Sequence, residues 1–494
     1  MKIDDHSNID GHTKKDDTKR DTPVRSIDGF DLLRIKAFRS LALWQGFPYV
    51  FQLLMLVVFI GLTFIGWQVY TPHGINDKLF AKTNLVTLMI WGTWWPLMVW
   101  LAVTMGRVWC MICPLELVSN ITERIGRKMA IKQKSLNKMM RSGAIIVFLY
   151  ALIQLLVAGI HLHRIPAYTS FFLLGLLTLS AFVGLFFKDR AFCRGFCPIG
   201  MLLNAYGRGG MIAVRAGSGD TCAGCSGKDC IMACNRNKPN ARSCPSLLNP
   251  PRLNTNKDCL VCGQCIKACE PDNMQLLLRR PFCESDAREE KASWPLTIFI
   301  MLVSGFVTYE LSTEWEYANQ VFLWIPRQLS LAVGLAENNG WIKGVWTLFL
   351  FPALLWSMLG ALVSFFDNIE KLTTVWRRLA LPMAVIIAAG HMAKAVAKMA
   401  SWAGYLPHAL REPAGLETVQ KMTTGAIAPP AALLSKPLVS VIGLALIFVG
   451  IAFAIREFRM AQPTARKFHF IPKVAFGGLL SVIVFGWAYE FIPF

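Results

Sequence analysis

Several long apolar runs, each of about 18 residues or more with almost no charge, constrain this chain more than any other feature. A helix needs about 20 mainly apolar residues to cross a bilayer. Of the 494 residues, 54% are hydrophobic and 17% are charged, whereas a soluble domain is about one quarter charged. We therefore predict an all-α polytopic membrane protein, and we exclude disordered, collagen-like and disulfide-rich secreted chains.

Nine membrane-spanning helices are expected. They lie at residues 48–70, 84–105, 143–161, 169–187, 294–312, 341–366, 379–399, 437–455 and 472–491. Of the 51 Lys and Arg residues, 41 lie in the amino-terminal tail and in loops on the same side as that tail. Because cytoplasmic loops carry an excess of Lys and Arg, we expect a cytoplasmic amino terminus, a cytoplasmic 188–291 segment and a periplasmic carboxy terminus.

The location that these features predict is a bacterial inner membrane, with lipids as partners. The net charge of +20 follows from the charged loops, so no nucleic acid partner is expected. No cleavable signal is expected, because the first forty residues are polar and charged. Residues 28–44 alternate apolar and basic side chains, which favours either a helix on the inner membrane surface or a basic flank that only fixes topology.

Four regions follow from this organisation. They are a basic cytoplasmic tail at 1–47, a four-span duplicated membrane domain at 48–210, a cytoplasmic insert at 211–292 and a five-span membrane domain at 293–494. All fourteen cysteines lie between Cys110 and Cys283, at or beyond the cytoplasmic ends of the spans. Thiols stay reduced in that compartment, so these cysteines are candidates for metal or iron–sulfur ligation rather than for disulfides.

The strongest motif is Cys259-x2-Cys262-x2-Cys265-x3-Cys269, with Pro271 two residues further on. This is the spacing of a bacterial ferredoxin, in which three cysteines bind one [4Fe–4S] cluster and the fourth binds the neighbouring cluster. An earlier run, with two extra residues before its third cysteine, consists of Cys222, Cys225, Cys230 and Cys234. We therefore predict a small α+β two-cluster ferredoxin domain of bacterial type within the insert.

The predicted ligands of the two [4Fe–4S] clusters divide between these runs. The first cluster is expected to bind Cys222, Cys225, Cys230 and Cys269. The second is expected to bind Cys259, Cys262, Cys265 and either Cys234, which we favour, or Cys244, which precedes Pro245. A zinc site in the first run is the alternative, since zinc also accepts four cysteines.

A second kind of motif occurs twice, each time after a pair of spans. One copy contains Cys110 and Cys113-Pro114, and the other contains Cys193 and Cys197-Pro198. Residues 48–120 and 143–205 therefore form an internal duplication. Two such hairpins packed side by side would bring the four cysteines together, to hold a third metal or cluster or to act as two redox-active dithiols. Structural cysteines at helix ends are the remaining alternative.

The predicted seventh span carries His391, Lys394 and Lys398 on one helix face. Ionisable residues within a span usually face a cavity, a partner or a cofactor. His161 and His163 lie at the outer end of the third span, so one of them and His391 are candidate axial ligands of a b-type haem. The same residues are instead candidates for a quinol pocket. The structural alternative is that both lysines reach the outer headgroups and that His391 is hydrogen-bonded among the helices.

Four spans with paired Cys-Pro motifs, followed by a two-cluster ferredoxin segment, resemble the NapH/NosR group of membrane polyferredoxins. The resemblance covers roughly residues 48–290. Cys193, Cys197 and Pro198 match the family's Cys-x3-Cys-Pro motif fully, whereas Cys110 and Cys113 have a gap of two. The resemblance implies that electrons pass between the quinone pool or a cytoplasmic donor and a periplasmic redox protein or cytochrome. The five later spans lie outside it.

The function we expect is therefore membrane-bound iron–sulfur electron transfer between quinol or a cytoplasmic reductant and a periplasmic redox partner. A second hypothesis is a maturation or regulatory factor. In that case, the Cys-Pro dithiols would reduce or deliver a metal such as copper to a periplasmic reductase. A transporter that senses redox state is less favoured, because the later spans contain no evident broken-helix repeat.

Overall fold

The computed structural model describes residues 29–283, 289, 291–367, 371–461 and 470–489. Within these residues, 7 helical segments are long and apolar enough to cross a membrane. They are Leu85–Met105, Pro166–Phe186, Trp294–Ser312, Gly340–Phe365, Leu372–Arg411, Lys436–Ala461 and Ile471–Tyr489. Each coincides with an expected span, so the prediction of a helical, multi-pass membrane protein is confirmed.

The other two expected spans are shorter apolar helices. The helix α2 covers Tyr49–Ile65 with 17 residues, and α9 covers Ala144–Gly159 with 16 residues. Both are shorter than the roughly 20 residues that a helix usually needs to cross the hydrocarbon core. The total of nine spans therefore stays a prediction.

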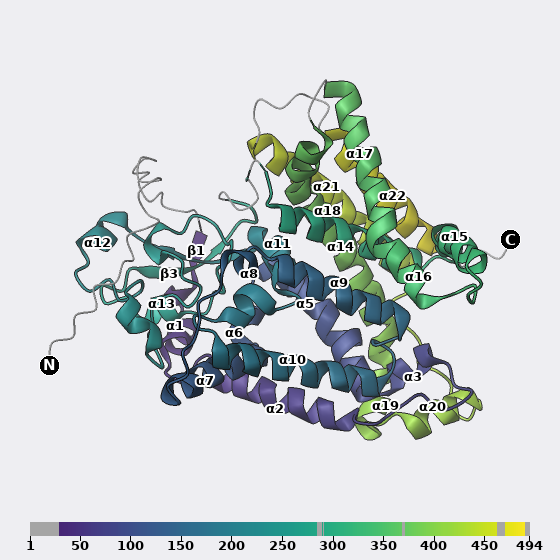
Figure 1. Ribbon diagram of the computed structural model, residues 1–494, viewed down its shortest axis with the longest axis horizontal. Coiled ribbons are helices and arrows are strands. Elements are labelled where there is room, and N and C mark those ends of the chain that lie inside the picture. Colours follow the sequence, from purple (N-terminus) through teal and green to yellow (C-terminus); the bar gives the residue numbers. More distant parts are fainter. Residues whose placement is uncertain (1–28, 284–288, 290, 368–370, 462–469, 490–494) are drawn as a thin grey trace.

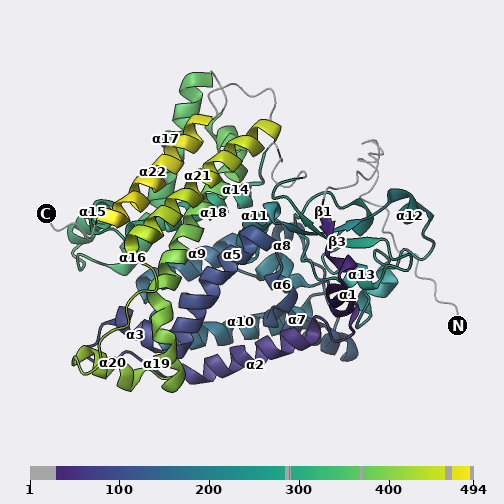
Figure 2. The ribbon, with the colours of Figure 1, turned by 180° about the vertical axis from the view of Figure 1, so that it is seen from behind.

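The long helices form two groups that meet where α5 (Trp95–Met105) packs against α18 (Leu372–Trp402) and where α9 packs against α14 (Trp294–Ser312). The amino-terminal group consists of α2, α9, α5 (Trp95–Met105) and α10 (Pro166–Phe186). The carboxy-terminal group consists of α14 (Trp294–Ser312), α17 (Phe351–Asp367), α18 (Leu372–Trp402), α21 (Lys436–Ala461) and α22 (Ile471–Tyr489). Figures 1 and 2 show the two groups from opposite sides.

The long helix α18 is the centre of the carboxy-terminal group, where it packs against α14, α21 and α22. Small residues on α18 allow its neighbours to approach closely, as is common for helices in membranes. At Gly450 of α21, an added Cβ would lie 2.7 Å from the Cβ of Ala389 on α18. The glycine therefore permits the close contact between these two helices.

A three-stranded antiparallel sheet lies at one end of the helices, beside α12 (Gly219–Gly224) and α13 (Gln264–Lys267) (Figure 1). Its strand order is β1 (Gly29–Asp31), β3 (Met274–Arg279), β2 (Ile212–Ala216). The tail before the first span therefore contributes a strand to the sheet that residues 211–292 were expected to form alone. The ferredoxin assignment of this region stays a prediction.

The same tail also contains the helix α1 (Lys36–Leu43), within the segment where a membrane-surface helix was expected. The side chain of Arg39 on α1 forms an ion pair with Asp272, just before β3. Nearby, the ammonium group of Lys267 donates to the carbonyl oxygens of Trp44 and Phe47, at 2.7 and 2.6 Å. The tail is thus attached to the insert as well as to the first apolar helix.

The opposite end of the helices is closed by three short helices, α3 (Asp77–Thr83), α19 (Leu406–Arg411) and α20 (Leu416–Thr423) (Figure 1). Asn84, after α3, donates its amide to the carbonyl of Ala414 at 2.8 Å. This bond connects the amino-terminal and carboxy-terminal groups at the end that lies away from the cysteines.

Candidate metal centres and a membrane cavity

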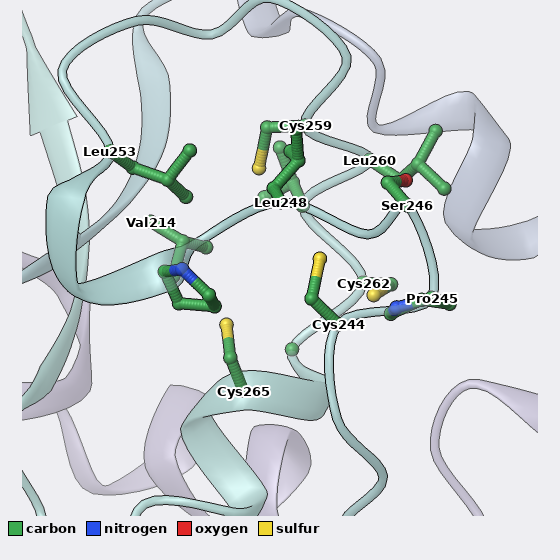
Figure 3. A pocket seen from close by; sticks show the side chains of 13 residues that line it. Val214, Cys244, Pro245, Ser246, Leu248, Leu253, Cys259, Leu260, Cys262 and Cys265 are labelled. Carbon is green, nitrogen blue, oxygen red and sulfur yellow. The ribbon is translucent and has the colours of Figure 1, made fainter. Parts of the chain in front are cut away.

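Four cysteines surround one cavity next to the sheet (Figure 3). They are Cys244, Cys259, Cys262 and Cys265. The cavity has an empty volume of about 350 Å³, and most of its other lining is apolar, with Val214, Leu248 and Leu253 among the contacts. Figure 3 shows the four sulfur atoms facing this common space from different sides.

The fourth cysteine of this set is Cys244 and not Cys234, which we had favoured. Cys234 is exposed in the short 3₁₀ turn Ala233–Asn237 and does not line the cavity. The backbone N–H of Cys244 donates to the carbonyl oxygen of Cys230 at 2.9 Å. This bond holds the Cys244-Pro245 segment against the first cysteine run. From that position, Cys244 lines the cavity together with the cysteines of the second run.

A second set of neighbouring cysteines consists of Cys222, Cys225, Cys230 and Cys269. Burial, followed by the charges of Cys269 and Cys222, raises the pKa of the Cys230 thiol to about 11. Asn273 contacts two members of the set: its backbone N–H donates to Cys269 Sγ at 3.2 Å, and its amide donates to Cys222 Sγ at 3.1 Å. These are the four cysteines that the sequence assigns to the first cluster.

A single metal ion and a [4Fe–4S] cluster require different spacings of the thiols that bind them. Among the described residues, no three His, Cys, Asp or Glu side chains converge closely enough to hold one metal ion. A tetrahedral zinc site, with Zn–S bonds of about 2.3 Å, requires sulfur atoms about 3.8 Å apart. A cluster of four irons holds its thiolates further apart, around a space such as the cavity in Figure 3.

The paired Cys-Pro motifs form a third set of four neighbouring cysteines. Burial, followed by the charges of Cys193, Cys110 and Cys197, raises the pKa of Cys113 well above its usual range. Burial is also the main cause that raises the pKa of Cys193 to about 11 and that of Cys197 to about 12. The structure thus places the two copies of the duplicated motif side by side.

The two copies share a backbone conformation despite their different gaps. Cys113 and Cys197 both have extended backbone, with ψ of 125° and 114°, as is favoured for a residue that precedes proline. The residues of the shorter gap lie within the α-helical turn Trp109–Ile112, whereas those of the longer gap lie within the π-helical turn Phe192–Phe196. A π-helical turn accommodates an extra residue, so the unequal gaps do not separate the motifs in space.

A buried carboxylate connects the third set to the cavity of Figure 3. Glu116, in α7 (Pro114–Lys128), accepts from Gln52 at 2.6 Å and pairs with Arg190 at 3.1 Å and Arg242 at 3.3 Å. Arg190 belongs to the second Cys-Pro motif, and Arg242 lies two residues before Cys244. The two arginines hold the pKa of Glu116 below its usual value, even though burial alone would raise it.

A separate cavity lies where the two helix groups meet. It brings together three of the residues singled out on the seventh span and one of the outer histidines, namely His391, Lys394, Lys398 and His163. The other outer histidine, His161, faces Asp77 instead, with 3.3 Å between Nδ1 and Oδ2. His161 therefore does not join this cavity.

Both ring nitrogens of His391 already have protein partners. Its Nε2 accepts from the indole N–H of Trp95 at 3.3 Å, and its Nδ1 lies 3.3 Å from the hydroxyl of Tyr206. A haem iron needs an imidazole nitrogen that is free to bind it. The residues present do not fit the predicted haem, and we derive no role for that group.

Lys394 does not extend to the outer headgroups, because its ammonium group is held by two carboxylates. It lies 2.6 Å from Glu314 and 3.7 Å from Glu310. Glu310 was not among the predicted site residues, although Glu310 is an ionisable residue inside the expected span 294–312. Glu116 was not predicted either, because its two ion-pair partners, Arg190 and Arg242, are distant in the sequence.

These features define a helical, multi-pass membrane protein with three groups of cysteines gathered at one end. Comparison with known proteins adds that the chain is similar to Ferredoxin-type protein NapH of Escherichia coli (strain K12). The two are 26% identical over 183 residues, which is 35% of this chain and 62% of NapH. The chain thus spans less than two thirds of the length of this relative.

Two proteins of Methanocaldococcus jannaschii are similar as well. Identity to the uncharacterized protein MJ0749 is 25% over 206 residues, 40% of this chain and 71% of that protein. Identity to the uncharacterized protein MJ0750 is 26% over 242 residues, 45% of this chain and 90% of that protein. No protein-family model matches the sequence, and no solved structure matches it.

Proposed function

We propose that this protein is a membrane-bound iron–sulfur electron-transfer protein. It passes electrons between quinol or a cytoplasmic reductant and a redox protein or cytochrome on the periplasmic side. The observation that carries the proposal is the grouping of twelve cysteines into three neighbouring sets of four at one end of the molecule. The similarity to a ferredoxin-type protein supports the same class of function.

In this proposal each set of four cysteines holds one [4Fe–4S] cluster, which supplies a one-electron redox centre. The apolar lining beside Cys259 and Cys265 excludes water, and solvent exposure is one of the factors that set a cluster's potential. The sheet end of the molecule, with most of the Lys and Arg residues, lies in the cytoplasm of a bacterial cell. The end with α3, α19 and α20 lies in the periplasm.

The burial of the Cys-Pro thiols favours cluster binding over the alternative of exchanging dithiols that deliver a metal. Thiol exchange requires a thiolate as nucleophile. With the pKa of Cys193 raised to about 11 and that of Cys197 to about 12, both are protonated thiols near neutral pH. A bound metal displaces the proton from such a thiol, so the same burial is compatible with ligation.

Serine substitutions at two different sets test the proposal. We expect Cys265→Ser and Cys193→Ser each to lower the iron content by about four atoms per chain and to remove a different part of the reduced protein's electron paramagnetic resonance spectrum. Cys234→Ser is the matched control, because Cys234 lies outside all three sets. If Cys193→Ser keeps its iron and loses only thiol labelling, the dithiol hypothesis replaces the third cluster.

A further inference from the structure

The cavity between the two helix groups has the lining of a ligand site rather than of a packing gap. Trp91, Trp95 and Phe306 supply flat aromatic surfaces, and Gln154, His163, Glu310 and Lys398 supply polar groups. Its residues come from α5, α9, α14 and α18 and from the segments next to them. Small-molecule sites typically combine a mostly apolar lining with a few placed polar groups.

One polar atom in this lining has no protein partner within the described residues. The Nε2 atom of His163 accepts from Arg164 Nε at 3.2 Å, so the ring hydrogen of neutral His163 resides on Nδ1. That Nδ1 is buried without a hydrogen-bond partner. Buried polar groups normally have partners, so the unpartnered N–H of a histidine that lines the cavity is a donor available to a ligand.

Two charged groups in the cavity are well placed to act on such a ligand. Glu310 lies 3.7 Å from Lys394, whose closer partner is Glu314 at 2.6 Å. The carboxylate of Glu310 is thus held near the cavity by a long ion pair and keeps the capacity to accept a proton. The ammonium group of Lys398 lies 5.0 Å from the ring centre of Trp402, and its N–H groups add further donors.

A line of tryptophans leads from this cavity to the paired Cys-Pro motifs. Ring centres are 6.5 Å apart between Trp91 and Trp95, and 6.4 Å apart between Trp95 and Trp94. The ring of Trp94 lies 5.5 Å from that of Trp109, which directly precedes Cys110 in the chain. A chain of neighbouring indole rings therefore connects the cavity to the third set of cysteines.

We propose that this cavity binds the ring of a lipid-soluble quinone or quinol, with His163 and Lys398 donating to its oxygens and Glu310 exchanging its proton. The proposal rests on the proposed function and deepens it. The ligand has to be soluble in the hydrocarbon region, flat enough to lie against indole rings, and an acceptor at an oxygen that reaches His163. The hydrocarbon chain of a phospholipid has no oxygen to accept hydrogen bonds from these donors, whereas a quinone ring meets all three requirements.

The chemical step balances as follows for the quinol. Both O–H bonds break, and the quinol loses two electrons and two protons as it becomes the quinone. The two electrons leave one at a time along Trp95, Trp94 and Trp109. A cluster held by Cys110, Cys113, Cys193 and Cys197 would accept the first electron and pass it to a further cluster before it accepts the second, because each cluster is a one-electron centre. Glu310 accepts the first proton and releases it to water before it accepts the second. Reduction of a quinone is the reverse of each of these transfers.

Equilibrium binding tests the site without relying on turnover. The probe is decylubiquinone, titrated calorimetrically into the full chain in detergent, both as purified and after its iron has been removed by chelation. We expect one saturable site per chain in both preparations. His163→Leu and Val157→Phe, which remove a donor and fill the cavity, should each weaken binding at least tenfold. Glu337→Gln, at an exposed carboxylate outside the cavity, is the matched control.

Glu310→Gln separates binding from proton exchange. This variant is expected to bind decylubiquinone with affinity close to that of the natural chain. Oxidation of decylubiquinol should be at least tenfold slower, since a positioned general base contributes about 10²–10⁴-fold. Absence of saturable binding, or binding that His163→Leu and Val157→Phe both leave unchanged, would overturn the quinone site. Natural protein that binds the probe but contains no iron when purified anaerobically, before any chelation, would count against the proposed function alone.

Discussion

At the scale of single residues, the account depends on which cysteines share a cavity. The spacing of the first run left Cys234 and Cys244 as alternatives for the fourth ligand. The structure brings Cys244, rather than Cys234, to the cavity lined by Cys259, Cys262 and Cys265, and ligation by Cys244 is therefore the prediction that we test. The two extra residues directly precede Cys230, and the carbonyl oxygen of Cys230 accepts a hydrogen bond from the backbone N–H of Cys244. Spacing alone does not reveal a bond between residues fourteen positions apart.

Substitution of these two cysteines therefore gives opposite expectations. Cys244→Ser should lose about four iron atoms per chain and the optical bleaching of one cluster upon reduction, whereas Cys234→Ser should keep both. Iron assay and a reduced-minus-oxidised spectrum measure the difference. The reverse result, with iron lost only from Cys234→Ser, would show that Cys234 and not Cys244 is the fourth ligand of the second cluster.

A second residue-scale prediction concerns the buried carboxylate of Glu116. Glu116→Gln leaves Arg190 and Arg242 without their shared counter-charge, and breaking a buried ion pair typically costs about 3–5 kcal/mol. We expect a loss of unfolding free energy of that size, measured by denaturant unfolding in detergent. The control is Glu417→Gln, at an exposed pair with Lys421, which should leave the unfolding free energy nearly unchanged. Equal stability of the two variants would contradict the role assigned to Glu116.

At the scale of helices, close packing in the carboxy-terminal group depends on small residues where α18 meets α21. Gly450→Ala places a methyl group 2.7 Å from the Cβ of Ala389, and such overpacking costs about 1–3 kcal/mol. Gly478→Ala, on α22, meets nothing within 4 Å and should be neutral or slightly stabilising, because alanine favours helix. Thermal unfolding of the two variants compares them, and a Gly450→Ala protein as stable as Gly478→Ala would contradict the packing described.

Helices were also the part of the fold that the sequence predicted best. Seven expected spans coincide with long apolar helices, because burial in lipid requires uninterrupted apolar runs that are visible in one dimension. Their ends were less predictable: α18 begins at Leu372, ahead of the expected start at 379, because its first turns pack against protein rather than lipid. The strand Gly29–Asp31 was not expected, since its partner β3 lies more than two hundred residues away.

The candidate sites were predictable only in part. Regular spacing revealed the cysteines of the ferredoxin run, and the rule that ionisable residues in spans are functional revealed Lys394. The same rule applied to Glu310 would have completed that cavity. The line from Trp91 to Trp109 was not predictable from the sequence, because its spacing depends on how the π-helical turn Leu88–Trp94 orients successive indole rings.

At the scale of the whole molecule, the proposed electron path has a direction in space. The cavity lined by Cys244, Cys259, Cys262 and Cys265 lies beside strand β2 of the sheet, and the cavity with Glu310 and His163 lies between the helix groups. Clusters at one face cannot by themselves carry an electron across a hydrocarbon layer of about 30 Å. The carboxy-terminal helices supply Glu310, Lys394 and Lys398 to that cavity. Their proposed role is therefore to complete the path that the cysteine-bearing half begins.

The central claim is that the three cysteine sets hold iron–sulfur clusters that carry electrons. The measurement that tests it most directly is a reduced-minus-oxidised optical spectrum of the anaerobically purified protein, with iron and sulfide assayed on the same sample. The account predicts broad bleaching in the visible region without sharp haem bands, and about twelve iron and twelve sulfide per chain. Intact protein that does not bleach, and that contains zinc in place of iron, would contradict the account.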